Sequence, residues 1–350
     1  MDLPDIDDEA IEQKNGAATR TGSKVVLAHF ADVVENMIVA SADLSNSDNT
    51  DGFLKKTKVF SRGDFTGAFL QAGVSELTMA ALANGMALHG GIIPVCGTFF
   101  VFSDFMKPSV RLAALMQLPV KYVWTHDAFR VGEDGPTHQP VEQEAQIRLL
   151  ENLKNHSGKR SLLALRPADT QETSVCWKIA METKDRPAAL LLSRQNIGEL
   201  PVQPGSTRYR DALGAEKGAY ILQDEQDFDV TLVGNGSEVS TLVAGAEMLR
   251  KDKKLKIRIV SAPSEGLFRD QDGKYQESVI PPDKPVFGLT AGLPVTLQGL
   301  VGPKGRVFGL EHFGYSAPFQ VLDEKFGFTA VNVYNKVLDY LKDYKNSDAR

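Results

Sequence analysis

Short apolar runs alternate with stretches of helical spacing in the first part of the chain. The apolar runs, rich in β-branched and aliphatic residues as buried strands are, lie at 37–40, 92–95, 120–124, 161–165 and 188–192. The helical stretches are 23–37, 74–89, 141–150 and 169–182, and the apolar segment 99–116 turns helical. Ser23 and Asp169 are the expected N-caps of two of these helices, Pro140 is expected in the first turn of another, and Leu77 and Leu88 should share one face of 74–89. Continuously apolar strands joined by helices are typical of a parallel sheet.

The same alternation returns in the last third of the chain. Strands are predicted at 230–233, 255–260, 286–289 and 306–309, with helices at 240–250 and 333–342. The segment 197–217 lacks periodicity and contains Pro201 and Pro204, so it is interpreted as a linker. Residues 1–19 are interpreted as a tail. The predicted fold class is therefore α/β, with two doubly wound, mostly parallel sheet domains at 20–196 and 218–350.

Composition and charge narrow the class of protein. The 350 residues carry a formal net charge of −6, which argues against nucleic acid or an anionic membrane as a partner held by general electrostatics. No run approaches the ~20 apolar residues of a membrane span. The two cysteines, Cys96 and Cys176, lie in apolar surroundings and indicate a cytoplasmic protein rather than a disulfide framework. The acidic start lacks the order of charges of a signal peptide.

The most polar connection follows the predicted strand 120–124. Its sequence, THDAFRVGEDGPTHQP (125–140), places His126, Asp134 and His138 at the carboxyl end of a strand, where ligands bind in open α/β sheets. Gly132 and Gly135 favour a fixed rather than a floppy loop, because glycine tolerates positive φ. A solvated surface connection would contain the same residue types, so the loop alone does not identify a reaction.

Other chemical signals have ordinary explanations when each is taken alone. Gly234-Asn235-Gly236 lacks the third glycine of a dinucleotide-binding turn, and a helix start capped by Ser237 is the favoured interpretation. Glu76 in the first turn of a helix favours the helix dipole, and Arg194 after a strand could form a surface ion pair.

Five motifs, taken together, resemble transketolase in order and spacing. They are GVSELTMAALANGMALHGG (73–91), TFFVFSDF (98–105), THDAFRVGEDGPTHQP (125–140), RPADTQET (166–173) and LSRQN (192–196). The resemblance covers essentially the whole chain and implies the pyrimidine-binding and C-terminal domains, which form the C-terminal half of a complete transketolase. It implies transfer of a two-carbon ketol unit, as in a glycolaldehyde transferase of the pentose phosphate pathway, with thiamine diphosphate as cofactor.

The resemblance also implies a role for individual residues. Glu76 would hydrogen-bond the aminopyrimidine ring and activate the cofactor, and His138 would lie beside the cofactor and the reacting carbonyl. An aromatic wall against the pyrimidine would consist of Phe99, Phe102 and Phe105, the last at a position where the family often has Tyr. The sugar phosphate would be held by Arg20, Ser47, His126 and Arg194, and a substrate hydroxyl by Asp134.

One family motif is absent from the chain. Transketolases hold the diphosphate through Mg or another divalent metal bound by a Gly-Asp-Gly motif of the N-terminal half, and no Gly-Asp-Gly occurs here. We therefore expect no metal ligands on this chain and no activity without an N-terminal partner, in a homodimer or a heterotetramer. A natural split subunit and a fragment of a longer chain are both compatible with this expectation. Alternatives are 1-deoxyxylulose-5-phosphate synthase, dihydroxyacetone synthase, or an idle assembly or regulatory partner of a transketolase.

Overall fold

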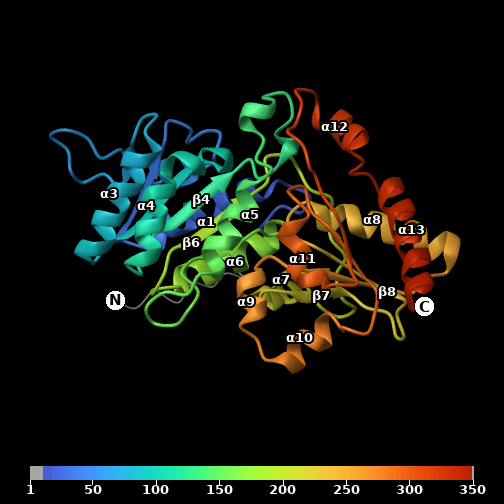
Figure 1. Cartoon of the computed structure of the whole chain (residues 1–350). Helices are drawn as coiled ribbons and strands as arrows, with labels where there is room; N and C mark the ends of the chain where they lie inside the picture. Colours follow the sequence, from blue (N-terminus) through green and yellow to red (C-terminus); the bar gives the residue numbers. More distant parts are fainter. Residues whose placement is uncertain (1–10, 349–350) are drawn as a thin grey trace.

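The first of two sheets has the strand order β2-β1-β3-β4-β6-β5, and every neighbouring pair is parallel. The computed structural model describes residues 11–348 (Figure 1). The strands of this sheet are β1 (Met37–Ser41), β2 (Phe69–Gln71), β3 (Ile93–Phe99), β4 (Lys121–Thr125), β5 (Leu163–Leu165) and β6 (Ala188–Leu192). Its helices are α1 (Thr19–Val33), α2 (Asp51–Leu54), α3 (Glu76–His89), α4 (Ser103–Leu115), α5 (Gln143–Asn152) and α6 (Thr170–Glu182), with 3-10 turns η2 (Phe100–Phe102), η3 (Phe129–Val131) and η4 (Pro136–His138).

Helices cover both faces of this sheet, and consecutive strand residues alternate between the two cores. Val39 and Val123 pack with α1 and α6, whereas Ala40 and Trp124 pack with α3, α4 and α5. Strands that are buried on both faces explain the continuously apolar runs in the sequence. The predicted doubly wound arrangement is confirmed.

The second sheet has the order β11-β10-β8-β9-β7, in which β7 is antiparallel to β9 and the other pairs are parallel. Its strands are β7 (Tyr220–Gln223), β8 (Val230–Gly234), β9 (Ile257–Ser261), β10 (Val286–Leu289) and β11 (Arg306–Phe308). Its helices are α8 (Glu238–Lys253), α9 (Glu265–Arg269), α10 (Gly273–Val279), α11 (Val295–Val301), α12 (Phe319–Phe326) and α13 (Ala330–Asp348). Strand β7, in which buried and partly buried residues alternate, was not predicted from the sequence, and neither were the short helices α9 to α12. The class, a second mostly parallel sheet, is confirmed.

Several predicted boundaries change where tertiary contacts override local signals. Helix α1 begins at Thr19, and Ser23 is not its cap but a buried residue whose Oγ accepts a hydrogen bond from Trp177 Nε1 at 2.9 Å. Ile11 is buried, and the first ten residues of the predicted tail lie outside the described residues, so the tail limit at residue 19 remains a prediction. Helix α5 begins at Gln143, beyond Pro140, because Glu142 occupies its N-cap position. At Asp169 the predicted cap is confirmed by a hydrogen bond from the Glu172 amide at 2.8 Å.

The segment between the two sheets has more structure than a linker without periodicity. It contains α7 (Arg208–Ala212) and the 3-10 turn η5 (Leu213–Lys217), both of which lie against α6. Buried Arg208 donates to Asp169 Oδ2 at 2.6 Å and to the Tyr220 hydroxyl at 2.7 Å. The segment therefore packs between the two units, and the domain limits at 196 and 218 remain predictions.

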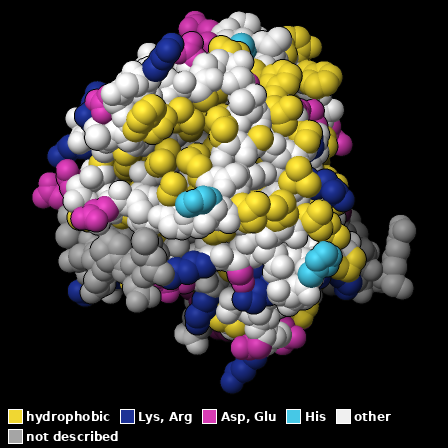
Figure 2. Space-filling view, turned by 90° about the vertical axis from the view of Figure 1, so that its left-hand side faces the viewer, with side chains coloured by type: hydrophobic (Ala, Val, Ile, Leu, Met, Phe, Trp, Pro, Cys, Tyr) yellow, Lys and Arg dark blue, Asp and Glu magenta, His cyan; other side chains and the backbone are white. Residues whose placement is uncertain are grey.

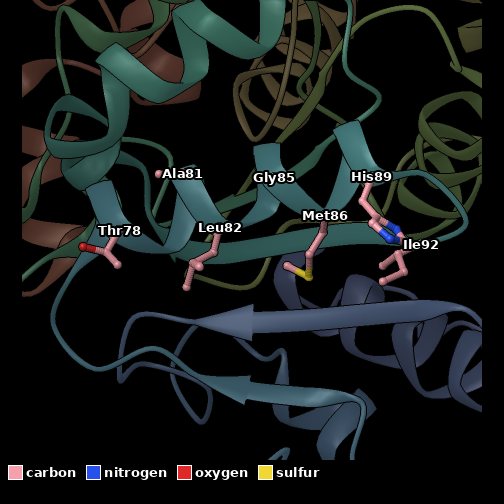
Figure 3. A pocket seen from close by; sticks show the side chains of 7 residues that line it. All are labelled: Thr78, Ala81, Leu82, Gly85, Met86, His89 and Ile92. Carbon is pink, nitrogen blue, oxygen red and sulfur yellow. The ribbon is translucent and has the colours of Figure 1, made fainter.

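The apolar face predicted for α3 is present but lies on the surface. Leu77 is 48% exposed and Leu88 64% exposed, whereas Met79 and Ala83 face the core instead. The helix is apolar nearly all round, so periodicity alone could not identify its buried side. Figure 2 shows hydrophobic side chains spread over this end of the molecule, and Figure 3 shows a groove along α3 lined by Leu82, Met86 and Ile92 among others. No helix within residues 11–348 is long and apolar enough to cross a membrane.

Candidate functional site

The predicted site residues gather at the carboxyl edge of the first sheet. Because its strands are parallel, the loops after β1, β3, β4 and β6 meet at one edge, together with the N-termini of α1 and α3. These segments carry Ser47, Phe99, Phe102, Phe105, His126, Asp134, His138, Arg194, Arg20 and Glu76. The arrangement follows from the topology, since each residue lies at the carboxyl end of a strand, in the connection that leaves it, or in the first turn of a helix.

Arg20 is the centre of a cluster suited to an anion. Its Nη1 donates to the Ser47 carbonyl oxygen at 2.6 Å and lies 3.5 Å from His126 Nε2. Burial lowers the pKa of Arg20, and the charge of Arg194 lowers it further. Asp134 acts on the same guanidinium in the opposite direction. Arg194 and Asp134 are exposed, so they contribute to the cluster through their charges and stay accessible to a ligand.

His126 is held in a constrained and neutral state. Its φ is 62°, a left-handed conformation that is rare for residues other than glycine. Thr125 Oγ1 lies 2.8 Å from Nδ1, and the Phe99 ring stacks on the imidazole with centroids 3.6 Å apart. Burial, followed by the positive charges of Arg20 and Arg194, lowers its pKa to about 2. In the tautomer where Thr125 donates to Nδ1, the Nε2–H is free to donate to an anion.

The three phenylalanines form a continuous wall beside His138. Phe99 and Phe102 stack with centroids 5.8 Å apart and planes 11° apart, and Phe105 lies 6.0 Å from Phe102. The His138 ring meets Phe102 edge-on at 5.4 Å, and Thr137 Oγ1 lies 2.8 Å from its Nδ1. Phe105 is 63% exposed, so a flat ligand could lie against this wall at the surface.

Glu76 lies next to Thr98, beside the start of this wall. It is the first residue of α3, is 7% exposed, and its Oε1 accepts a hydrogen bond from Thr98 Oγ1 at 3.3 Å. Thr98 precedes Phe99, whose ring stacks on His126. The structure thus brings a buried carboxylate, an aromatic wall and a cationic cluster to one edge of the sheet, with no hydrogen bond or ion pair between Glu76 and Arg20 or Arg194.

Asp48 is a site-supporting residue absent from the sequence-based expectation. Fully buried, it accepts hydrogen bonds from Ser41 Oγ at 2.7 Å and from the Thr50 amide at 2.9 Å. Burial raises its pKa to about 6, against the hydrogen bonds from Ser41 and Thr50, which lower it. Its charge also acts on Arg20. The local signal was an aspartate two residues before Thr50, a spacing typical of an Asx turn.

The glycine pair Gly234–Gly236 has a different role from the expected capped helix start. Helix α8 does begin there, but the Ser237 side chain makes no capping hydrogen bond. Its hydroxyl instead donates to Glu238 Oε1 and accepts from Arg130 Nη1, both at 2.8 Å. The Ser237 hydroxyl is occupied by these hydrogen bonds with Arg130 and Glu238, so it does not cap the helix.

Comparison with known proteins gives a consistent family. Residues 15–199 match the family described as "Transketolase, pyrimidine binding domain", and residues 218–329 match the "Transketolase-like TK C-terminal domain". The transketolase of Halalkalibacterium halodurans is 43% identical over 324 residues, which cover 92% of this chain and 46% of that protein. The transketolase of Aquifex aeolicus is 41% identical over 334 residues, or 95% of this chain and 46% of that protein. The chain thus spans about half the length of the curated relatives it matches.

Solved structures agree with the sequence comparisons. Transketolase from Leishmania mexicana superposes with a TM-score of 0.87 at 34% identity, over 98% of this chain and 48% of that one. A split-gene transketolase, described as an inactive β4 tetramer, shares the fold with a TM-score of 0.71 at 23% identity, over 93% of this chain and 99% of that one. The chain belongs to the transketolase family of thiamine diphosphate enzymes and corresponds to the C-terminal half of its members.

Proposed function

We propose that this chain, together with an N-terminal transketolase half, transfers a two-carbon ketol unit from a ketose phosphate to an aldose phosphate. The observation that carries the proposal is the gathering at one sheet edge of Glu76, the Phe99–Phe102 wall and the Arg20–His126 pair. Glu76 and the wall would hold the cofactor ring, and the Arg20–His126 pair would hold the distal phosphate. The reacting carbon would lie beside His138, which meets the wall edge-on.

The pyrimidine end of thiamine diphosphate fits the residues present. The Phe99, Phe102 and Phe105 rings offer a stacking face for a flat heterocycle, and the buried Glu76 carboxyl accepts from Thr98, the residue before Phe99. The bound cofactor would supply a nucleophilic carbon that accepts the ketol unit. Glu76 would hold a proton at the pyrimidine ring nitrogen, and His138 would donate to oxygen as negative charge develops on it.

The cationic cluster suits the phosphate of the sugar substrate. Arg20 and Arg194 offer planar donors that match phosphate oxygens, and neutral His126 can add an N–H without bringing a third desolvated charge. Ser47 would add its hydroxyl, while Asp134 would accept from a sugar hydroxyl. Burial and then the charge of Arg194 lower the pKa of Arg20, and a bound dianion would offset both effects by favouring the charged guanidinium.

The diphosphate and its divalent metal, Mg or another, would be held by the N-terminal half. Among residues 11–348, no group of three or more His, Cys, Asp or Glu side chains is arranged to hold a metal ion. The exposed apolar face of α3 supports contact with that half or with a second copy, in a homodimer or a heterotetramer. Both cysteines are free and buried, which is compatible with a cytoplasmic location.

The decisive experiment is an assay of ketol transfer from xylulose 5-phosphate to ribose 5-phosphate. We expect no turnover from this chain alone and turnover when an N-terminal transketolase half is added with thiamine diphosphate and Mg²⁺. A complex of the two halves that forms stoichiometrically but transfers nothing would support an idle assembly partner instead.

A further inference from the structure

The loop 126–140 carries three proposed substrate-binding side chains on a backbone that is costly to hold. Positive φ angles occur at His126 (62°), Gly132 (88°) and Gly135 (79°). Glycine adopts such angles freely, whereas a non-glycine residue there costs ~1–3 kcal/mol and persists only when its surroundings fix it. Thr125 and Phe99 hold the His126 ring from within the first sheet domain, and the other contacts that fix the loop come from the C-terminal domain.

Arg130, in the middle of the loop, directs every side-chain donor into the C-terminal domain. Its Nε donates to Asp323 Oδ1 at 2.7 Å, and Nη1 donates to Glu238 Oε1 at 3.1 Å. The remaining hydrogen bonds reach Ser237 Oγ at 2.8 Å, Thr241 Oγ1 at 3.2 Å and the Phe328 carbonyl at 3.4 Å. Arginine has five N–H donors, and all five are thus used by residues 107–198 positions away.

The neighbouring Phe129 adds an apolar part to the same anchor. It is fully buried, and its ring meets Phe326 edge-on at 5.2 Å and Phe328 at 4.8 Å. The η3 turn therefore packs against α12, while Arg130 reaches the first turn of α8.

A second anchor holds the later part of the loop. Gln139 Nε2 donates to the Gly132 carbonyl at 2.9 Å within the loop and to the Tyr315 carbonyl at 3.0 Å in the C-terminal domain. Ser316 Oγ donates to the Glu133 carbonyl, directly before Asp134. A Cβ added to Gly135 would lie 3.2 Å from Ser316 Cβ, so the two segments are in close contact.

A third anchor acts at the start of the loop. Asp127, next to His126, accepts from Arg166 Nε at 2.9 Å, and Arg166 Nη1 donates to Asn235 Oδ1 at 2.8 Å. Arg166 also donates to Glu238, whose other carboxylate oxygen accepts from Arg130. One buried carboxylate of the C-terminal domain thus joins the first and second parts of the loop.

We infer that the C-terminal domain fixes the conformation of loop 126–140, with Arg130 and Ser316 as positioning residues for the substrate site. The role at the substrate site rests on the proposed function, whereas the anchoring itself does not. Neither residue needs to touch the substrate. Displacement of a binding group by about an ångström can cost a large factor in rate, so the anchors would act through the placement of His126, Asp134 and His138.

Ser316→Ala is the main test, because Ser316 is exposed and its loss should leave the fold intact. The matched control is Ser278→Ala, which removes a similar exposed hydrogen bond, from Ser278 Oγ to the Tyr275 carbonyl at 2.7 Å, elsewhere in the same domain. Amide hydrogen exchange on the full chain should speed up roughly fivefold across 132–139 in Ser316→Ala alone, as expected for one net hydrogen bond. Arg130→Lys, which keeps the charge but not the five-bond geometry, should produce a larger increase over 126–140.

Kinetic measurements distinguish a role of Ser316 in placing substrate-binding groups from a role in loop stability alone. With the N-terminal half added, Ser316→Ala should raise KM for ribose 5-phosphate about fivefold with kcat changed less than twofold, and Ser316→Thr, which keeps the hydroxyl, should restore it. Exchange over 132–139 equal in Ser316→Ala and Ser278→Ala would overturn the anchoring. Faster exchange with an unchanged KM would overturn the positioning role. Absence of ketol transfer by the unmodified pair would refute the proposed function instead, while the exchange result would still decide the anchoring.

Discussion

Arg20 Nη1 lies 3.5 Å from His126 Nε2, although 106 positions separate the two residues in the chain. The contact joins the start of α1 to the end of β4 and keeps a permanent cation against an imidazole. Burial and, after it, the charge of Arg20 keep the imidazole neutral, so the pair presents one charge, not two, to a ligand. That protonation state leads to the first prediction.

His126 should not titrate near neutral pH, because burial and two arginines lower its pKa to about 2. In a histidine NMR titration of the ligand-free chain, its resonance should stay constant between about pH 5.5 and 8, the range in which an ordinary histidine titrates. Its depressed pKa stabilises the fold above the unfolded-state value of about 6.5, and that contribution is lost as pH falls toward 2. The free energy of unfolding should thus fall more steeply below about pH 6.5 than in His126→Asn. A normal titration midpoint for His126 would contradict this prediction.

Asp48 should affect the pH dependence of folding stability in the opposite direction to His126. Its folded-state pKa of about 6 exceeds the ordinary value of 3.8, so the protonated form is the one that folding favours. This contribution is complete below pH 3.8 and is lost as pH rises through about 6. Denaturant unfolding of Asp48→Asn, which stays uncharged, should therefore show a gain in stability relative to the parent that builds up between about pH 3.8 and 6 and is constant above that range. The control is Asp343→Asn, at an exposed aspartate paired with Arg306, which should give no such crossover.

Glu76→Gln should remove cofactor activation while preserving shape. The amide keeps the contact with Thr98 but cannot share a proton with the pyrimidine nitrogen. Exchange of the thiazolium proton into heavy water, measured with the reconstituted pair, should slow by ~10²–10⁴-fold, and turnover should fall for phosphorylated and non-phosphorylated donors alike. Glu247→Gln, at an exposed position of α8, serves as the control. Equal exchange rates in Glu76→Gln and the parent would remove Glu76 from the catalytic assignment.

The apolar groove of α3 should be needed for assembly. Leu82 is 49% exposed and lines this groove (Figure 3), so Leu82→Asp introduces a charge where an apolar partner surface is proposed. Light scattering should show a smaller assembly for Leu82→Asp, with and without the N-terminal half. Val331→Asp, at a 57% exposed position of α13, should leave the mass unchanged. If both variants assemble like the parent, the α3 groove is not an interface.

A structural feature of this chain could be predicted from sequence where it depends on neighbouring residues, and not where it depends on residues far apart in the chain. Five of the six strands of the first sheet were predictable because burial on both faces makes them continuously apolar, whereas the three-residue strand β2 was not predicted. The candidate site residues were chosen from motifs near strand ends, and their roles remain predictions. Leu77 and Leu88 show the limit, since an apolar helix face does not reveal whether this chain or another one covers it. The contacts of Arg130 show a second limit of sequence-based prediction, because its partners are 107–198 positions away and no local pattern marks them. Strand β7 is four residues long and antiparallel, so it lacks the signature of its neighbours.

Arg194→Ala should selectively weaken the binding of phosphorylated substrates. Arg194 is exposed in the free chain, yet its charge lowers the pKa of both Arg20 and His126, so it lies within reach of an anion bound between them. Loss of a hydrogen bond between charged groups should cost roughly 1.5–3 kcal/mol, which corresponds to a rise of about 10- to 150-fold in KM for ribose 5-phosphate.

A donor without phosphate distinguishes this role from a general loss of structure. Hydroxypyruvate cannot reach the cationic cluster and the reacting carbon at once, so its kcat/KM should change less than about threefold in Arg194→Ala. Arg306→Ala, which removes an exposed arginine paired with Asp343 on the C-terminal domain, should leave both substrates unaffected. If kcat/KM falls equally for hydroxypyruvate and for the sugar phosphates in Arg194→Ala, Arg194 supports the site as a whole. Arg20 and His126 alone would then recognise the phosphate.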